Sequence, residues 1–328
     1  MIRSDARPTR RHALLGAALG AGSLALLRPA DALAKAALVG QPAPYFYRFK
    51  FGTGEATIVS DGTLPLGDPN TNFTGLSGDE MKRQLTDNFL PTANAVLEQN
   101  ILILNTGDRM VLFDTGMGDV KLFGPTTGKL LTTLKQAGID PADIDAVVMT
   151  HAHIDHCGGN CGPDGKPNFP NAQFYISQAD YDFWTDEKLV PKGFEAFLTQ
   201  ARKNLTPIRD RIVFIKDGQE FLPGITAMAA PGHTIGHMIF MIQSGNSQMA
   251  YIGDLAHHPV LLLEKPLTQF AYDSDPAQSA QTRLKYLTMF AEKRTPILAY
   301  HFAWPGLGHV AKQGDGFRYY PEPMKMEM

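Results

Sequence analysis

Apolar residues recur along the chain in short runs that are separated by glycines and polar turns. The clearest helical spacing covers residues 277–292, and a second helix is predicted over 77–89, where Ser77 and Glu80 begin a capping box. Shorter helices are predicted at residues 129–136, 179–184 and 194–203. Strands are predicted at residues 45–50, 56–60, 100–105, 110–114, 146–150, 174–177, 211–216, 226–229, 237–242, 249–252 and 296–300.

This mixture of strands and helices indicates an α+β fold. Many of the strand patterns are short and look antiparallel, which favours two sheets packed face to face with helices outside over a doubly wound sheet. No linker or low-complexity segment divides residues 35–328, so we expect one domain there, with a loose start over 35–44.

The N-terminal segment, residues 1–34, has a different character. Arginines precede an apolar run over residues 13–27, and small residues end the segment. This order is typical of an export signal, and the run is too short and too rich in glycine and alanine for a membrane span. The residues around Arg10 and Arg11 resemble a twin-arginine signal, with an ordinary secretory signal as the alternative. We therefore expect a periplasmic or secreted mature protein.

Composition narrows the classes of partner. The full chain is 44% hydrophobic and 19% charged, which suits a globular protein. Its first 34 residues carry five Arg and two Asp, so their removal leaves 25 basic and 31 acidic residues, a formal charge of −6. A mildly acidic protein is a poor electrostatic partner for nucleic acid, so we expect a small-molecule substrate and no nucleic acid.

Ionisable side chains gather in the stretch HAHIDHCGG, which follows the predicted strand 146–150. His151, His153, Asp155 and His156 fall within six positions. Such a cluster suits a metal site, a pH-sensitive loop or a solvated turn, and the stretch alone does not separate these.

Three more candidates also follow predicted strands. His233 follows the predicted strand 226–229, Asp254 follows 249–252, and His301 follows 296–300. Strand ends can converge on one edge of a sheet, where loops hold polar groups on a rigid frame. We therefore expect the five histidines and two aspartates to meet.

Seven imidazole and carboxylate donors are too many for one tetrahedral ion. Imidazole nitrogen and carboxylate oxygen suit zinc and similar divalent ions. Two ions that share one carboxylate would each have four protein ligands, with the ions about 3.5–4 Å apart. The sequence therefore predicts two divalent metal ions, zinc first, with manganese, cobalt or iron also compatible.

The order His-x-His-x-Asp-His, then His, Asp and His resembles the metallo-β-lactamase-fold hydrolases over roughly residues 45–320. The resemblance implies a four-layer αββα sandwich, with Asp114-Thr115-Gly116 as the turn before the motif. It also implies ligand roles. One metal would take His151, His153 and His233; the other would take Asp155, His156 and His301; Asp254 would bridge them, and Asp114 would support a ligand or the backbone.

Segments around Phe123, His233 and His301 are similar to the exported methyl parathion hydrolase and lactonase group. By that similarity Phe123, Trp184 and Phe197 would be aromatic walls of a substrate pocket; plain core packing is the alternative for each. An aspartate at position 254 argues against antibiotic hydrolysis, and an intact His153 argues against oxygen-reducing diiron chemistry.

These features predict a hydrolase in which two ions lower the pKa of a bridging water, so that the resulting hydroxide cleaves lactones or aryl esters, with additional organophosphate triesterase activity. Asp254, Asp155 and His257 are the expected catalytic residues. His257, three positions after Asp254, resembles the polar donor of lactonases; a surface histidine is the alternative. The competing functions are a dedicated organophosphate hydrolase and, in another class, a non-catalytic metal-binding protein.

Several features leave alternatives open at this point. Export would permit a disulfide between Cys157 and Cys161, and two small buried side chains are the alternative. The apolar run over residues 260–263 would line the pocket mouth or form a homodimer contact. His237, His258 and His309 are given no role.

Overall fold

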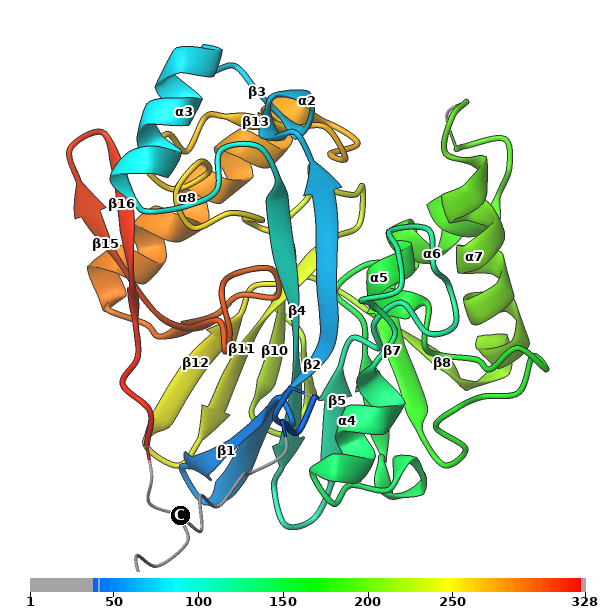
Figure 1. Ribbon diagram of the computed structural model, residues 1–328. Coiled ribbons are helices and arrows are strands. Elements are labelled where there is room, and N and C mark those ends of the chain that lie inside the picture. The colour runs from blue at the N-terminus through cyan, green and yellow to red at the C-terminus, as the bar shows by residue number, and fades with distance from the viewer. Residues whose placement is uncertain (1–37, 41, 191, 326–328) are drawn as a thin grey trace, which may run out of the picture. The chain divides into compact units, whose positions relative to one another are not determined.

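The computed structural model describes residues 38–40, 42–190 and 192–325, and Pro44–Met328 is the unit that carries the fold (Figure 1). The expected export segment, residues 1–34, lies outside the described residues. Within the described part of the chain, none of the helices combines the length and apolar character needed to cross a membrane.

The first sheet has seven strands in the order β1-β2-β4-β5-β6-β7-β8. The strands are β1 (Phe46–Phe51), β2 (Gly54–Gly67), β4 (Ala95–Asn105), β5 (Met110–Phe113), β6 (Ala146–Val148), β7 (Gln173–Ser177) and β8 (Ile212–Ile215). Neighbours from β1 to β5 pair antiparallel, whereas β5 to β8 pair in parallel. The sheet is therefore mixed, and its parallel half leads into the stretch that begins at His151.

The second sheet also has seven strands, in the order β16-β15-β14-β12-β11-β10-β9. They are β9 (Glu220–Leu222), β10 (Ile225–Ala229), β11 (Met238–Ser244), β12 (Ser247–Tyr251), β14 (Ile297–Leu298), β15 (Leu307–Gln313) and β16 (Gly316–Pro321). Only the pairing of β12 with β14 is parallel among these described strands. A separate two-stranded sheet joins β3 (Phe73–Thr74) to β13 (Gln269–Phe270).

Helices cover the outer faces of both sheets (Figure 1). The α-helices are α2 (Pro69–Asn72), α3 (Gly78–Asp87), α4 (Leu130–Gln136), α5 (Ile154–Cys157), α6 (Gln178–Thr185), α7 (Glu195–Leu205) and α8 (Pro276–Lys293); the 3-10 helices are η1 (Pro141–Asp143) and η2 (Thr206–Arg211). On the first sheet, α4 packs against β2 and α6 against β7, while α8 packs against β15 of the second. The predicted four-layer αββα sandwich is confirmed.

The inner faces of the two sheets form the core. Phe113 of β5 lies 5.3 Å from Tyr251 of β12 and 5.8 Å from Phe240 of β11, measured between ring centroids. All three rings are fully buried. This contact fixes the sheets face to face, and so it fixes the distance between the loops that leave them.

Most predicted elements occur, but their limits differ in informative places. The helix expected over 77–89 is α3, and the Ser77 side chain accepts a hydrogen bond from the Glu80 amide as its cap. Strand β2 runs through 14 residues because a bulge after Ser60 lets it continue past the point where the apolar pattern stops. The hairpin of β15 and β16 and the parallel pairings were not predicted.

Two alternatives that the sequence left open are now decided. Cys157 and Cys161 are free thiols, and both are buried. The apolar run over residues 260–263 is also buried, so these side chains offer no surface for a dimer contact, and they do not line the cavity above the seven candidate ligands.

Candidate metal centre

Seven buried histidine and aspartate side chains meet where loops leave the two sheets. The first sheet supplies four of them, through the loop after β6 and through α5: His151, His153, Asp155 and His156. The second sheet supplies three, after β10, β12 and β14: His233, Asp254 and His301. Each exposes 7% or less of its surface. The structure thus brings together all seven residues that the sequence predicts as ligands.

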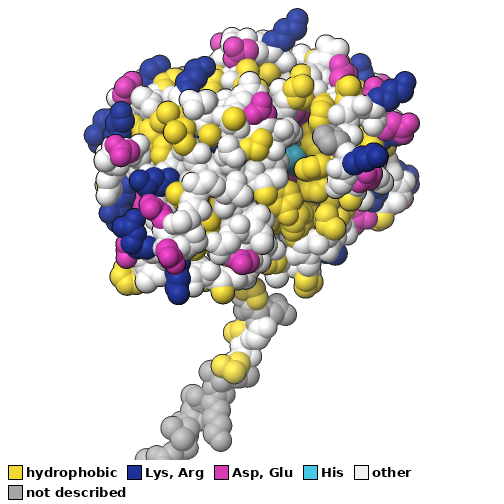
Figure 2. All heavy atoms as spheres, turned by 90° about the horizontal axis from the view of Figure 1, so that it is seen from above, with side chains coloured by type: hydrophobic (Ala, Val, Ile, Leu, Met, Phe, Trp, Pro, Cys, Tyr) yellow, Lys and Arg dark blue, Asp and Glu magenta, His cyan; other side chains and the backbone are white. Residues whose placement is uncertain are grey.

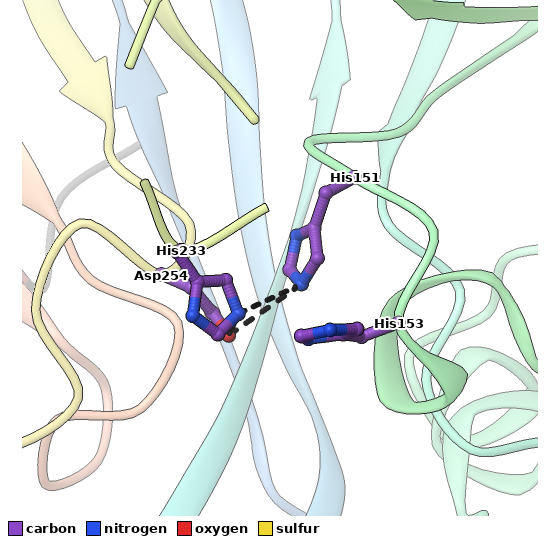
Figure 3. Close-up of side chains that lie close together, drawn as sticks. All are labelled: His151, His153, His233 and Asp254. Carbon is purple, nitrogen blue, oxygen red and sulfur yellow. Dashed lines mark hydrogen bonds and ion pairs between the residues drawn. The ribbon is translucent and has the colours of Figure 1, made fainter. Parts of the chain in front are cut away.

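Asp254 stands between two groups of histidines. Its Oδ2 lies 3.1 Å from His233 Nε2 and 3.7 Å from His151 Nε2. Its other oxygen, Oδ1, lies 3.1 Å from His156 Nε2 and 3.3 Å from His301 Nε2. One carboxylate therefore presents a separate oxygen to each group. Figure 3 shows the first group, in which His151 and His153 lie opposite His233 and Asp254.

The same division follows from the ligand atoms themselves. Those of His151, His153, His233 and Asp254 all lie within 4.8 Å of one another. The same limit encloses a second set, Asp155, His156 and His301. Two sets of this composition match two divalent ions with Asp254 shared.

The histidine rings are oriented by hydrogen bonds on the far side from Asp254. His156 Nδ1 donates to Asp114 Oδ2 at 2.9 Å, and His233 Nδ1 donates to Asp273 Oδ1 at 2.8 Å. His301 Nδ1 donates to the Glu98 carbonyl at 2.8 Å, and His151 Nδ1 contacts Thr150 Oγ1 at 2.9 Å. Rings held in this way present Nε2 to the centre, as metal-binding histidines do.

Buried polar atoms without a hydrogen bond show that the centre fits metal ions. Among the described residues, His153 Nε2, His156 Nε2 and Asp254 Oδ1 have no hydrogen-bond partner. Leaving such atoms unsatisfied is costly, and a divalent cation would satisfy them together. The donor set of imidazole nitrogen and carboxylate oxygen suits zinc.

Burial and mutual contacts set the charges of the centre. Burial opposes ionisation of Asp254, but the nearby imidazoles, His156 first, outweigh it and hold the pKa of this carboxyl well below its usual range. The pKa of Asp155 is likewise lowered to about 2, against the effect of burial. Burial and neighbouring histidines keep the pKa values of His151 and His153 well below the usual range. The carboxylates are ionised and these two rings neutral, the forms that bind metals.

The pKa values of His156 and His233 are shifted in the opposite direction, upward. Burial lowers the pKa of each ring, but the carboxylates outweigh it: Asp254 and Asp273 raise the pKa of His233 to about 9, and Asp254 raises that of His156 well above the usual range. A proton on Nε2 takes the position of a metal ion. Metal binding must therefore displace these protons, and it weakens as the pH falls.

Asp114 has the supporting role that the resemblance implies. Its Oδ1 accepts the Thr150 amide at 2.8 Å, and its Oδ2 accepts from His156 and, at 3.2 Å, from the Tyr251 hydroxyl. Its φ of +62° is in the left-handed region, which fits the tight turn before Gly116. Asp273, which supports His233, was not predicted, because the two-residue strand β13 before it was not predicted and no motif singles it out.

His237 holds the backbone of Asp254. Its Nδ1 donates to the Ala230 carbonyl at 3.1 Å, and its Nε2 accepts the Asp254 amide at 3.1 Å. Burial and nearby His233 lower the pKa of His237 to about 3, so the ring is neutral and can accept this hydrogen bond. Gly253 has a φ of +46°, and a Cβ there would lie 2.9 Å from His237 Nε2. Only glycine fits this turn.

The two remaining histidines without a role, His258 and His309, have hydrogen-bond partners outside the seven candidate ligands. His258 Nδ1 accepts the Val260 and Leu261 amides, each at 3.2 Å, so it caps a turn. His309 Nε2 lies 3.1 Å from the Glu322 carboxylate on the β15–β16 hairpin.

The centre forms the floor of a cavity that is lined by polar and apolar side chains. We call its polar residues the floor: His153, Asp155, His233, Asp254, His257 and His301. We call its other residues the wall: Leu64, Leu66, Leu97, Phe123, Phe197, Phe270 and Tyr272. Figure 2 shows a histidine side chain visible from outside between hydrophobic side chains. The cavity therefore offers an apolar lining above a charged centre, as ligand sites commonly do.

The aromatic residues predicted for the pocket are only partly in it. Phe123 and Phe197 belong to the wall. Trp184, expected there too, instead packs behind His153 at 4.9 Å between rings and is only 1% exposed, so its position corrects that expectation. The sequence did not predict the remaining wall residues, because nothing separates them from core residues: Leu64, Leu66, Leu97, Phe270 and Tyr272.

His257 lies in the floor and contacts the bridging carboxylate. Its Nε2 is 3.0 Å from Asp254 Oδ2, and its ring stacks on Phe270 at 3.9 Å between centroids. Burial lowers the pKa of His257 to about 4, so the ring is neutral. The surface position considered as an alternative is therefore wrong. One possible metal-binding atom each of His257, Asp254 and His301 lies within 4.8 Å of the other two.

Comparisons with known proteins agree with this geometry. Residues 95–301 match the Metallo-beta-lactamase superfamily. An N-acyl homoserine lactonase of Bacillus cereus is 26% identical over 237 residues, which cover 67% of this chain and 84% of that protein. The structure of AidC, a dizinc quorum-quenching lactonase in complex with a product, is similar with a TM-score of 0.81 and 30% identity, covering 86% of this chain and 98% of that one.

A second solved structure, the hydrolase AbOPH of the beta lactamase superfamily, has a TM-score of 0.80 and 28% identity over 87% of this chain and all of that one (100%). The superfamily match covers more than half of the chain and includes all seven residues of the centre. The chain belongs to the metallo-beta-lactamase superfamily, and it is a metal-dependent hydrolase of that superfamily.

Proposed function

We propose that this protein is a dizinc lactonase that opens the ring of N-acyl homoserine lactones, and that it also accepts aryl esters. The position of Asp254, with one oxygen toward each histidine group, carries the proposal because a shared carboxylate suits a two-metal centre. The lactonase relatives support the substrate, and the apolar wall suits an acyl chain.

In this proposal His151, His153 and His233 would hold one ion, Asp155, His156 and His301 would hold the other, and Asp254 would be a ligand of both. When bound, two zinc ions activate water at neutral pH and polarise the ester carbonyl. The chain supplies the rest: Asp114, Asp273 and the Glu98 carbonyl fix the direction of three imidazoles, so the ligands need no reorganisation during the reaction. The wall excludes water from the apolar part of the substrate.

His257 is proposed to favour carbonyl substrates over phosphorus substrates. Its neutral ring contacts Asp254 and lines the cavity, so it can hydrogen-bond near the position of the reacting oxygen. Organophosphate triesterase activity is the second candidate. The observation that favours it is the aromatic part of the wall, where Phe123, Phe197 and Tyr272 would surround an aryl leaving group.

We also propose that residues 1–34 direct export and are removed, which would place the mature enzyme in the periplasm or outside the cell. The observations behind this are the arginines, the apolar run and the small residues of that segment. Folding before twin-arginine export would allow the metal to be loaded in the cytoplasm.

A substrate panel with metal analysis on the same sample tests the function. The mature protein is assayed with N-acyl homoserine lactones, an aryl ester and a phosphotriester, and its metals are counted by mass spectrometry. We expect two zinc ions per chain, highest kcat/KM on a lactone, loss of activity on chelation and recovery with zinc. Two bound metals without turnover of any of these substrates would instead indicate a metal-binding protein.

A further inference from the structure

A buried aspartate of helix α6 connects two of the loops that carry the centre. Asp180 is fully buried, at 0% exposure. Its Oδ2 accepts the Ala152 amide at 2.6 Å, and its Oδ1 accepts the Gly236 amide at 3.0 Å. The two oxygens of one carboxylate thus accept hydrogen bonds from two backbone amides, one in a loop of the first sheet and one in a loop of the second.

The positions of these amides matter more than their number. Ala152 lies between His151 and His153, on the loop that leaves β6 of the first sheet. Gly236 lies three residues after His233, on the connection from β10 to β11 of the second sheet. Through two hydrogen bonds, Asp180 therefore joins the backbone segments that supply all three histidines of one ligand group.

The connection leaves little freedom on the Gly236 side. Ser177, the cap of α6, donates from Oγ to the Gly236 carbonyl at 2.7 Å and accepts the Asp180 amide at 3.1 Å. A Cβ on Gly236 would lie 2.2 Å from Ser177 Oγ and 2.5 Å from the Asp180 nitrogen. The peptide therefore lies directly on the start of the helix, which fixes its distance from Asp180.

The other ligand group is supported by different residues. Asp114 orients His156, the Glu98 carbonyl orients His301, and the Tyr300 hydroxyl donates to the Asp155 carbonyl at 2.6 Å. The hydrogen bonds found for Asp180 reach neither of the segments 155–156 and 301. Asp180 is thus connected to one ligand group alone, whereas Asp114 reaches both groups, because it contacts His156 directly and His151 through the Thr150 hydroxyl.

We propose that Asp180 is a positioning residue that sets the spacing of His151, His153 and His233, and thereby the zinc affinity of that half of the centre alone. The inference rests on the proposed two-metal function. Removing a carboxylate that orients metal ligands commonly lowers metal affinity by about 10- to 100-fold. Because Asp180 acts on one ligand group, its removal should separate the two binding steps.

Zinc titration against a chromophoric chelator tests this in the full mature chain. We expect Asp180→Ala to weaken one of the two zinc-binding steps by about 10- to 100-fold and to leave the other unchanged. Asp180→Asn keeps one acceptor oxygen and should give a smaller loss at the same step. Asp182→Asn is the matched control, because Asp182 is an exposed carboxylate of the same helix; it should bind zinc as the wild type does.

Tyr300→Phe provides the reciprocal variant, since the Tyr300 hydroxyl supports the Asp155 segment of the other group. It should weaken the step that Asp180→Ala leaves intact. The proposal is overturned if folded Asp180 variants bind both ions normally, if they lose both equally, or if Asp180→Ala and Tyr300→Phe weaken the same step. If Asp180→Ala does not fold, Asp180→Asn is read by the same criteria.

Hydrogen exchange on the same samples distinguishes this inference from the proposed function. The Ala152 and Gly236 amides should be protected in the wild type and should exchange at least about tenfold faster in Asp180→Ala, with no change in Asp182→Asn. If the wild type binds two zinc ions and hydrolyses no lactone, the function fails while the Asp180 result stands. Unchanged exchange of both amides overturns the positioning role whatever the substrate.

Discussion

The floor and the wall of the cavity are built on different principles. The floor consists of buried ionisable groups, and most of them have a second directional contact, as His233 has with Asp273 and His301 with the Glu98 carbonyl. The wall consists of apolar side chains that touch each other, as Phe123 and Phe197 do with Tyr272, at 6.2 and 6.3 Å between centroids.

This difference separates the chemistry from the choice of substrate. Hydrogen bonds and charges depend steeply on geometry, so a change in the floor alters the reacting centre itself. Apolar contacts depend mainly on area and shape, so a change in the wall alters which substrate fits. We therefore expect large, substrate-independent effects from the floor and small, substrate-dependent effects from the wall.

The largest effect is expected at Asp254, where both halves of the floor meet. Asp254→Asn removes the charge shared by the two histidine groups while keeping the size of the side chain. We expect kcat/KM to fall on the order of 1000-fold for every substrate, with loss of at least one zinc ion. Steady-state kinetics on a lactone and an aryl ester, with metal counts, measure this.

An equal loss on both substrates is the signature of the floor. If Asp254→Asn retains two zinc ions and near-normal kcat/KM, the carboxylate does not bridge the ions. Asp182→Asn, which changes an exposed aspartate, should leave both measurements unaltered.

A second contrast is between Asp254 and Asp61, a buried carboxylate of β2. Its oxygens accept the amides of Met117, Gly128 and Leu130 at 2.8–3.0 Å, so it ties both ends of the loop that carries Phe123. Asp254 is held ionised by imidazoles. Burial raises the pKa of Asp61 from 3.8 to about 6, because the hydrogen bonds from backbone amides only partly offset the effect of burial.

This shift predicts a pH-dependent stability. The folded state holds the Asp61 proton more tightly than the unfolded chain, so the stabilisation is complete below about pH 4 and is lost as the pH rises through about 6. The free energy of unfolding of the wild type minus that of Asp61→Asn should fall by on the order of 3 kcal/mol between about pH 4 and pH 7. Urea unfolding with chelator in both samples measures it; a constant difference would contradict the prediction.

The floor could be predicted from the sequence because its residue types are rare and follow strands. Two of its members, His153 and Asp155, lie within HAHIDHCGG, and His233, Asp254 and His301 follow predicted strands. Asp180 and Asp273 escaped prediction for a physical reason: a carboxylate that accepts backbone or imidazole hydrogen bonds can come from any segment that the fold brings near. Leu64 and Phe270 look like core residues, since the wall uses the same apolar types.

The fold was predictable to a similar depth. Helix α8 and the sandwich follow from apolar spacing and from the mixture of elements. The extent of β2 does not, because its bulge places Asp61 and Gly62 inside a strand where the apolar pattern breaks. Parallel pairing of β5 through β8 depends on long-range contacts, which local pattern does not encode.

His257 tests the boundary between floor and wall, since it contacts Asp254 and stacks on Phe270. His257→Leu removes the hydrogen bond and keeps an apolar side chain. We expect kcat/KM on lactones to fall about tenfold, the value of roughly one such bond, while phosphotriester hydrolysis is spared or raised. Zinc content should be unchanged. If both activities fall together, or zinc is lost, His257 belongs to the metal centre and does not select the substrate.

The smallest effect is expected in the wall. Phe123 is half-buried, so Phe123→Ala should weaken the binding of an apolar substituent of the substrate by about 1 kcal/mol, which lowers kcat/KM roughly fivefold. The loss should appear with a decanoyl homoserine lactone and be absent with a butanoyl one, because only the longer chain reaches beyond the floor. Leu122→Ala is the matched control, since Leu122 is exposed and does not line the cavity. An equal loss on both chain lengths would mean that Phe123 supports the floor, and the separation of chemistry from substrate choice would then fail at this residue.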